Sequence, residues 1–205
     1  MKSVRIFTIT MALAGCLGAA TAPIITYTAS GTFATVATSG ADSLKLAGEP
    51  FNVSIAVSAS TPPYKYGPNW AAYHQLKLTG TVHSGLLGSS PISIASSEAS
   101  IIQAVNPGKD DQFTMEAPVK VVGVNLTITA LIVMPLGTIK NQLLHPFSST
   151  ITLTPAIASM SYSDGTNTTV LAIQTGTLSA TIPGGAATAP GQYVDPAPVD
   201  LKRIR

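Results

Sequence analysis

The stretch at residues 119–135, VKVVGVNLTITALIVMP, has the longest two-residue alternation of the chain. One side of it is apolar (Val122, Val124, Leu126, Ile128, Ala130 and Ile132), and the other side carries Gly123, Asn125, Thr127 and Thr129. A period of two places successive side chains on opposite faces of a β-strand. Burial of each large apolar member contributes about 1.5–3 kcal/mol. The stretch therefore predicts a single strand that anchors a sheet core, with shorter strands pairing on either side.

Segments of strand character occur on both sides of this stretch. Only 10% of the 205 residues are charged, while 17 glycines and 15 prolines separate runs rich in Thr, Ser, Val and Ile. This composition is typical of short strands joined by tight turns. The expected strands cover residues 24–38, 44–46, 51–58, 76–83, 92–95, 101–105, 113–117, 151–153, 158–163 and 169–182. We therefore predict an all-β fold, a single antiparallel β-sandwich that spans residues 23–183.

Both ends of the chain differ from this central domain. Residues 1–22 have the features of an export signal, because a short basic start is followed by an uncharged apolar run and then by small residues. We therefore expect an exported protein that is secreted, periplasmic or anchored to a membrane. Residues 184–205 combine scattered prolines and alanines with few large apolar side chains, which predicts a disordered tail.

Cys16 is the single cysteine of the chain, so no intramolecular disulfide can form. Residues 13–16, LAGC, resemble a bacterial lipobox, in which the signal is cut before the cysteine and its thiol carries a lipid anchor. Ordinary cleavage near Ala20 is the competing interpretation, because the apolar run continues beyond Cys16. Under the first interpretation Cys16 is a lipidation site and the sole point of membrane contact, whereas under the second it is removed with the signal.

Four aromatic residues, Tyr64, Tyr66, Trp70 and Tyr73, lie close together in a chain of which only 6% is aromatic. Paired prolines and a Gly-Pro step interrupt the alternation over residues 60–75, so this segment is predicted to be a loop. Exposed rings on a rigid domain stack on sugars or anchor a protein partner. In the alternative, which we expect, the rings plug one end of the core. The four residues are the candidate ligand-binding residues.

No arrangement typical of catalysis or of metal binding is evident in the sequence. The three histidines lack a metal-ligand spacing, and the nine Asp and Glu residues show no local signature of the facing carboxylates of a glycosidase. Asp164-Gly165 predicts a tight hairpin turn rather than a calcium loop, because further acidic ligands are missing. The sequence therefore predicts no metal, no cofactor and no catalytic residue. Without the basic start the chain is close to neutral, which does not favour nucleic acid as a partner.

A polar-Gly-Thr-apolar step occurs at residues 30–33, 79–82 and 175–178. Glycine inside a strand commonly marks a bulge or a close approach of two backbones, so these steps predict equivalent bends in different strands. The segments at 31–33, 46–51 (LAGEPF) and 78–82 resemble parts of uncharacterised exported β-rich proteins of environmental bacteria. This resemblance covers about the first third of the mature chain. It implies export and a β-sandwich, and it transfers no catalytic residue.

These observations predict a non-enzymatic, exported β-sandwich protein that acts as a binding or structural module at the cell envelope or outside the cell. A carbohydrate-binding module that uses the aromatic loop is the first alternative. A carboxylate-dependent glycoside hydrolase is the second, and it requires two acidic side chains that face each other across a cleft. The expected partner is a carbohydrate or another envelope protein.

Overall fold

The computed structural model describes residues 22–182, apart from 106–108, 122, 140–143 and 148. The predicted export segment up to residue 21, with Cys16, and the predicted tail at 184–205 lie outside the described residues. Within the described residues no helix is long and apolar enough to cross a membrane. The described chain consists mainly of β-strands, which confirms the all-β prediction.

Ten strands and one short helix make up the described chain. They are β1 (Ile24–Phe33), β2 (Pro50–Ser58), β3 (Lys65–Gly67), β4 (Trp70–Ser84), η1 (Gly85–Leu87), β5 (Ser90–Ala104), β6 (Asp111–Val121), β7 (Val124–Met134), β8 (Ile151–Leu153), β9 (Ala158–Ser163) and β10 (Thr168–Thr181). The separate strands expected at 92–95 and 101–105 are one strand, β5. The loop expected at 60–75 is partly wrong, because β3 lies within it and β4 begins inside it.

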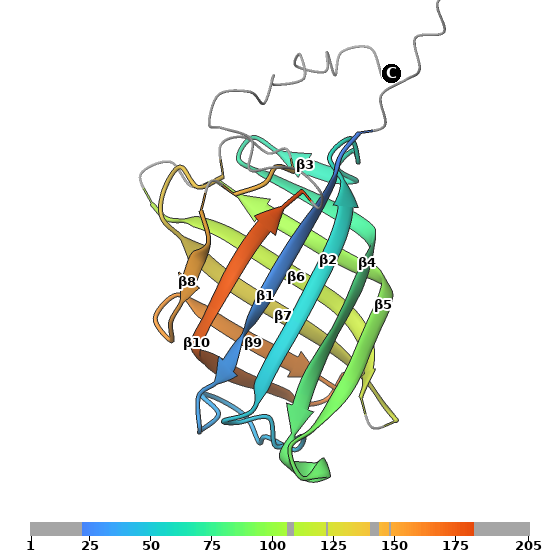
Figure 1. The fold of residues 1–205 in the computed structure, drawn as a ribbon, viewed down its shortest axis with the longest axis vertical. Coiled ribbons are helices and arrows are strands. Elements are labelled where there is room, and N and C mark those ends of the chain that lie inside the picture. The colour runs from blue at the N-terminus through green and yellow to red at the C-terminus, as the bar shows by residue number, and fades with distance from the viewer. Residues whose placement is uncertain (1–21, 106–108, 122, 140–143, 148, 183–205) are drawn as a thin grey trace, which may run out of the picture.

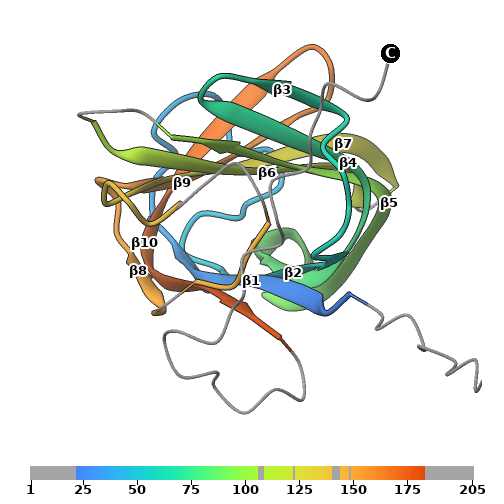
Figure 2. The ribbon, with the colours of Figure 1, turned by 90° about the horizontal axis from the view of Figure 1, so that it is seen from above.

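Eight of these strands close into an antiparallel β-barrel rather than a β-sandwich (Figures 1 and 2). Around the ring the order is β1, β2, β4, β5, β6, β7, β9 and β10, and β10 pairs with β1 to complete it. The short strands β3 and β8 add to β4 and β10. The predicted sandwich is therefore wrong. A β-sandwich and a β-barrel require the same alternation along each strand, so the sequence pattern could not separate the two architectures. The pairing of Thr26 with Thr181 distinguishes them, and alternation does not encode it.

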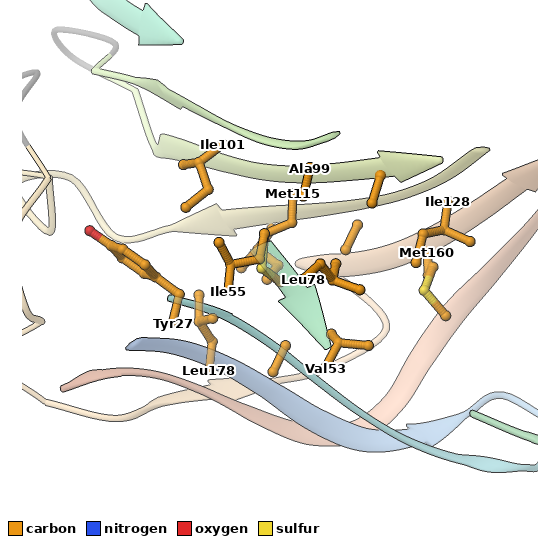
Figure 3. Packing of buried hydrophobic residues seen from close by; sticks show 14 of the residues in the cluster. Tyr27, Val53, Ile55, Leu78, Ala99, Ile101, Met115, Ile128, Met160 and Leu178 are labelled. Carbon is orange, nitrogen blue, oxygen red and sulfur yellow. The ribbon is translucent and has the colours of Figure 1, made fainter. Parts of the chain in front are cut away.

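The interior of the barrel is filled by apolar side chains from every wall. An eight-stranded barrel is just wide enough for inward side chains to meet across its axis. In Figure 3, Leu178 of β10 and Met115 of β6 extend toward one another from opposite walls, and both are nearly inaccessible to solvent. The two walls thus pack like the two sheets of a sandwich, which is why the pattern along each strand fits either architecture.

Two non-strand segments cover the ends of the barrel. We call the end where β1 begins and β10 ends the upper end, as drawn in Figure 1. Residues 34–49, which connect β1 to β2, cover the lower end and bury Leu44 and Leu46 against the core. The short strand predicted at 44–46 is therefore wrong, because these residues belong to the cover. At the upper end, residues between β7 and β8 bury Ile139 and Leu144 in the same core.

The stretch at 119–135 is the end of one strand, a turn and the next strand. β6 and β7 form a hairpin in which Val121 pairs with Val124, and Gly123 has a positive φ of 82°. The predicted single strand is therefore wrong at its start. The apolar face is correct from Leu126 to Ile132, where alternate residues are buried, but Val124 beside the turn is 45% exposed. A two-residue alternation continues through a tight turn without a break, so the pattern concealed the turn.

The glycine steps lie where two strand backbones come unusually close. Gly31 of β1 pairs with Gly176 of β10, at the seam where the barrel closes. A Cβ atom on Gly31 would lie 2.2 Å from the carbonyl oxygen of Thr175, which is far inside contact distance. A Cβ atom on Gly80 of β4 would meet the carbonyl oxygen of Asn52 in the same way. The expected close approach is thus confirmed, and it gives the strands the curvature that closure requires.

Candidate functional site

Three of the four candidate aromatic residues lie on a two-stranded extension at the upper end of the barrel. β3 pairs with the first residues of β4, so that Gly67 faces Trp70 and Tyr66 faces Ala71. The side chains of Tyr64, Tyr66 and Trp70 are 54%, 55% and 39% exposed, respectively. The structure therefore places these three rings at the surface, in contrast to the core plug that we expected.

The three exposed rings occupy two faces of this extension. Neighbouring residues of a strand point to opposite faces, and paired residues share a face. Tyr66 therefore shares the face of Ala71, whereas Trp70 lies on the opposite face with Gly67. The indole packs on Gly67 so closely that a Cβ atom there would lie 2.3 Å from its Nε1 atom. Trp70 thus has a fixed position even though part of its ring is open to solvent.

Polar groups surround the ring of Tyr64. The backbone N–H of Tyr64 donates to the carbonyl oxygen of Ala72 at 2.9 Å, which ties the residue to β4. The Lys65 ammonium lies 5.5 Å from the centroid of the Tyr64 ring, within cation–π distance. The ring of His74 lies 5.3 Å away and is tilted by 47°. Rings with adjacent hydrogen-bonding groups are suited to ligands that carry both apolar and polar faces.

Tyr73 does not belong to this surface. It is fully buried inside the barrel, where its hydroxyl group forms a hydrogen bond with the backbone of Leu144. Burial disfavours the phenolate and raises the pKa of Tyr73 to about 12, although the hydrogen bond opposes this shift. Tyr73 is therefore part of the core, as the burial interpretation expected, and only three of the four candidates are available to a ligand.

The upper interior of the barrel contains polar side chains that sequence reasoning missed. Tyr27 donates its hydroxyl hydrogen to the carbonyl oxygen of His145 at 3.0 Å and accepts from the His145 backbone N–H at 3.1 Å. Asp111 Oδ2 accepts from the backbone N–H of Ile139 at 2.9 Å. With Tyr73, these side chains bind the backbone of the segment that covers the upper end. The cover is thus attached by buried hydrogen bonds as well as by apolar packing.

Gln103 and Asp111 also contain buried polar atoms that have no partner. Both residues are fully inaccessible to solvent, and within the described part of the chain the amide Oε1 and Nε2 of Gln103 and the Oδ1 of Asp111 form no hydrogen bond. Each such atom costs about 1–3 kcal/mol of stability. The sequence contains a signal for this pair, because Gln103 follows Ile101 at the next inward position of an apolar strand. The polar amide of Gln103 interrupts the series of inward apolar side chains, and such interruptions often occur at functional sites.

A groove lies where β5 and β6 separate. These strands pair only over Ser100–Ala104 and the facing residues of β6, and below this region they diverge. The groove has a volume of about 350 Å³. It is lined by Ala95, Ser96, Ser97, Glu98, Pro118, Val119, Lys120, Asn125 and Leu126. Glu98 is the acidic side chain among these described residues, so the groove does not present the two facing carboxylates of a glycosidase.

Asp164-Gly165 lies in a hairpin connection, as predicted, but the connection is longer than a tight two-residue turn, because Ser163 pairs with Thr168 and four residues separate them. It joins β9 to β10, and Gly165 has a positive φ of 89°. The Asp164 carboxylate accepts from the backbone N–H groups of Asn167 and Thr166, and these bonds hold its pKa below the usual value. In the part of the chain that the structure describes, no cluster of three His, Cys, Asp or Glu side chains could hold a metal ion. The turn therefore uses its carboxylate to order its own backbone.

The fold defines a class, that of antiparallel eight-stranded barrels with a filled interior, and the exposed rings lie on an extension of one wall. A scan against protein-family models, a search of curated proteins and a search of solved structures each gave no match. The function of this chain is therefore inferred from its own residues.

Proposed function

We propose that this chain is an exported, non-enzymatic binding module in which Tyr64, Tyr66 and Trp70 contact the ligand. The exposure of these rings carries the proposal. The other aromatic side chains of the described chain are buried or pack against the core (Tyr27, Phe33, Phe51, Tyr73, Phe113, Phe147 and Tyr162). Large exposed rings gathered on one element are typical of binding surfaces. Export is supported by the signal-like residues 1–22.

A carbohydrate is the ligand that we favour. Tyr64, at the bend that precedes β3, and Tyr66, within β3, are two residues apart, and both rings are exposed. Their exposed rings can stack on apolar sugar faces, while Lys65 and His74 beside Tyr64 offer hydrogen bonds to hydroxyl groups. Because Trp70 lies on the opposite face, it is expected to contact a different part of an extended polysaccharide or to support the ribbon from behind.

Binding of the mature protein to insoluble cellulose, chitin and peptidoglycan tests this proposal. Tyr66→Ala is expected to weaken the retention of the protein at least tenfold, because a stacked ring contributes about 1.5 kcal/mol or more to binding. Val36→Ala, which removes a 73% exposed apolar side chain from the lower end, serves as the control and is expected to bind like the wild type. If the wild type bound none of the three polymers, these carbohydrates would be excluded as ligands.

Trp70 fluorescence gives an independent readout of the same surface. Because the indole is 39% exposed and Trp70 is the sole tryptophan, iodide is expected to quench its emission. A soluble oligosaccharide that contacts the ring would reduce this quenching. Blue-shifted emission that resists iodide would contradict the exposed position of the ring and remove it from the contact surface.

A further inference from the structure

We propose that the upper interior of the barrel holds a small neutral molecule, hydrogen-bonded between Gln103 of β5 and Asp111 of β6. The site is separate from the aromatic surface and independent of the proposed function. The proposal is based on three fully buried polar atoms that have no hydrogen-bond partner among the described residues. Buried polar groups in native proteins are almost always hydrogen-bonded, so an amide with both ends unpaired indicates a missing partner.

The strand register places the two side chains close together on one face. Gln103 pairs with Phe113, and Asp111 precedes Phe113 by two residues. Both side chains are inward and occupy diagonal positions, which lie about 7–8 Å apart across an antiparallel pair. No direct hydrogen bond joins the two side chains in the described structure. The separation is suited to one small bridging molecule.

The chemistry of the three atoms defines the class of molecule. Gln103 Oε1 and Asp111 Oδ1 each require a donor, whereas Gln103 Nε2 requires an acceptor. A molecule with two donors and an acceptor satisfies all three atoms, as water does and as a primary amide does. A bare cation could bind the two oxygen atoms but would leave Gln103 Nε2 without an acceptor. An anion would face the oxygen atoms of both side chains.

The surroundings isolate this position from bulk solvent. Phe113 stacks on Tyr27 with ring centroids 5.1 Å apart, and Phe147 packs edge-on against Phe113 at 5.7 Å. Ile139, whose backbone N–H binds the other oxygen of Asp111, is itself buried. A molecule between Gln103 and Asp111 therefore lies beside aromatic and apolar side chains, and we expect it to exchange slowly with solvent.

Oxygen-17 magnetic relaxation dispersion counts long-lived internal water and tests the proposal directly. We expect Gln103→Leu to lose one long-lived water that the wild type contains. Gln112→Leu is the matched control, since Gln112 is the exposed residue next to Asp111 on β6, and it is expected to keep the wild-type count. Circular dichroism checks that each variant is folded, and Gln103→Met replaces the leucine variant if that variant does not fold.

Mass spectrometry of a solvent extract distinguishes water from an organic molecule. A compound with an amide or similar group that is extracted from the wild type and from Gln112→Leu, but not from Gln103→Leu, would identify an organic occupant. In that case the internal water count is expected to be equal in all three proteins. Equal water counts together with no compound specific to the proteins that retain Gln103 would overturn the proposal.

Discussion

One carboxylate, that of Asp42, forms three of the hydrogen bonds that hold the lower cover of the barrel, and its removal tests the structure. Asp42 Oδ2 accepts from the backbone N–H of Ala47 at 2.8 Å, and Oδ1 accepts from the N–H of Leu46 at 3.1 Å and from the hydroxyl of Tyr162 at 3.0 Å. Tyr162 in turn accepts from the N–H of Leu44 at 3.3 Å. The network therefore joins the cover to β9 inside the barrel.

Asp42→Ala removes three hydrogen bonds, two of which join a carboxylate to backbone N–H groups. Hydrogen bonds to charged groups contribute about 1.5–3 kcal/mol each, and because the three share one side chain we expect a combined loss of about 3–5 kcal/mol. Tyr162→Phe leaves Asp42 its two backbone partners and is expected to cost about 1–2 kcal/mol. The double variant should lose less than the sum of the two, because both substitutions break the same Tyr162–Asp42 bond.

Urea unfolding followed by circular dichroism measures these differences. Glu98→Ala is the control, because it removes an exposed carboxylate from β5 and is expected to change the stability by less than about 0.5 kcal/mol. If Asp42→Ala unfolded within that same margin of the wild type, the carboxylate would not hold the cover. Losses from Asp42→Ala and Tyr162→Phe that simply added would show that the two side chains do not interact in solution.

Two further predictions concern the seam and the core. Gly31→Ala is expected to cost about 3 kcal/mol or more in urea unfolding, because its Cβ would collide with the backbone of β10. Gly123→Ala, where the added atom meets nothing within 4 Å but φ is positive, should cost only about 1–2 kcal/mol; equal losses would refute the close approach. Burial raises the pKa of Tyr73 to about 12, so the folded state retains a proton that the unfolded state releases, and stability falls as pH rises from about 10 to about 12. In Tyr73→Phe the stability should fall less over this pH range than in the wild type. If the two proteins lost the same stability, the raised pKa of Tyr73 would be contradicted.

The sequence predicted individual strands far better than their arrangement. Alternation located the inward residues of β7 from Leu126 to Ile132, because each inward position must be apolar whatever sheet receives it. The closing contact between β1 and β10 joins residues at opposite ends of the domain, and no local pattern specifies it. The same limitation explains Leu44 and Leu46, whose spacing resembles a strand although they lie in a cover that is ordered by Asp42.

The candidate site was predicted in part. Aromatic density identified the segment that contains Tyr64, Tyr66 and Trp70, but composition could not separate exposed rings from the buried Tyr73. On β4 the exposed Trp70 and the buried Tyr73 lie on opposite faces, and the loop predicted there concealed the strand. The polar pair inside the barrel was missed because its significance depends on the absence of partners, which only a three-dimensional arrangement reveals.

The seam between β1 and β10 determines when this protein can become a barrel. Thr26 and Thr181 are neighbours in space, yet nearly the entire domain separates them along the chain. A chain that emerges from its N-terminus therefore presents β1 with one open hydrogen-bonding edge until the last strand has been made. Such distant pairing makes folding slow, and open edges invite pairing between molecules. The final strand thus closes the edge of β1, which another chain could otherwise join.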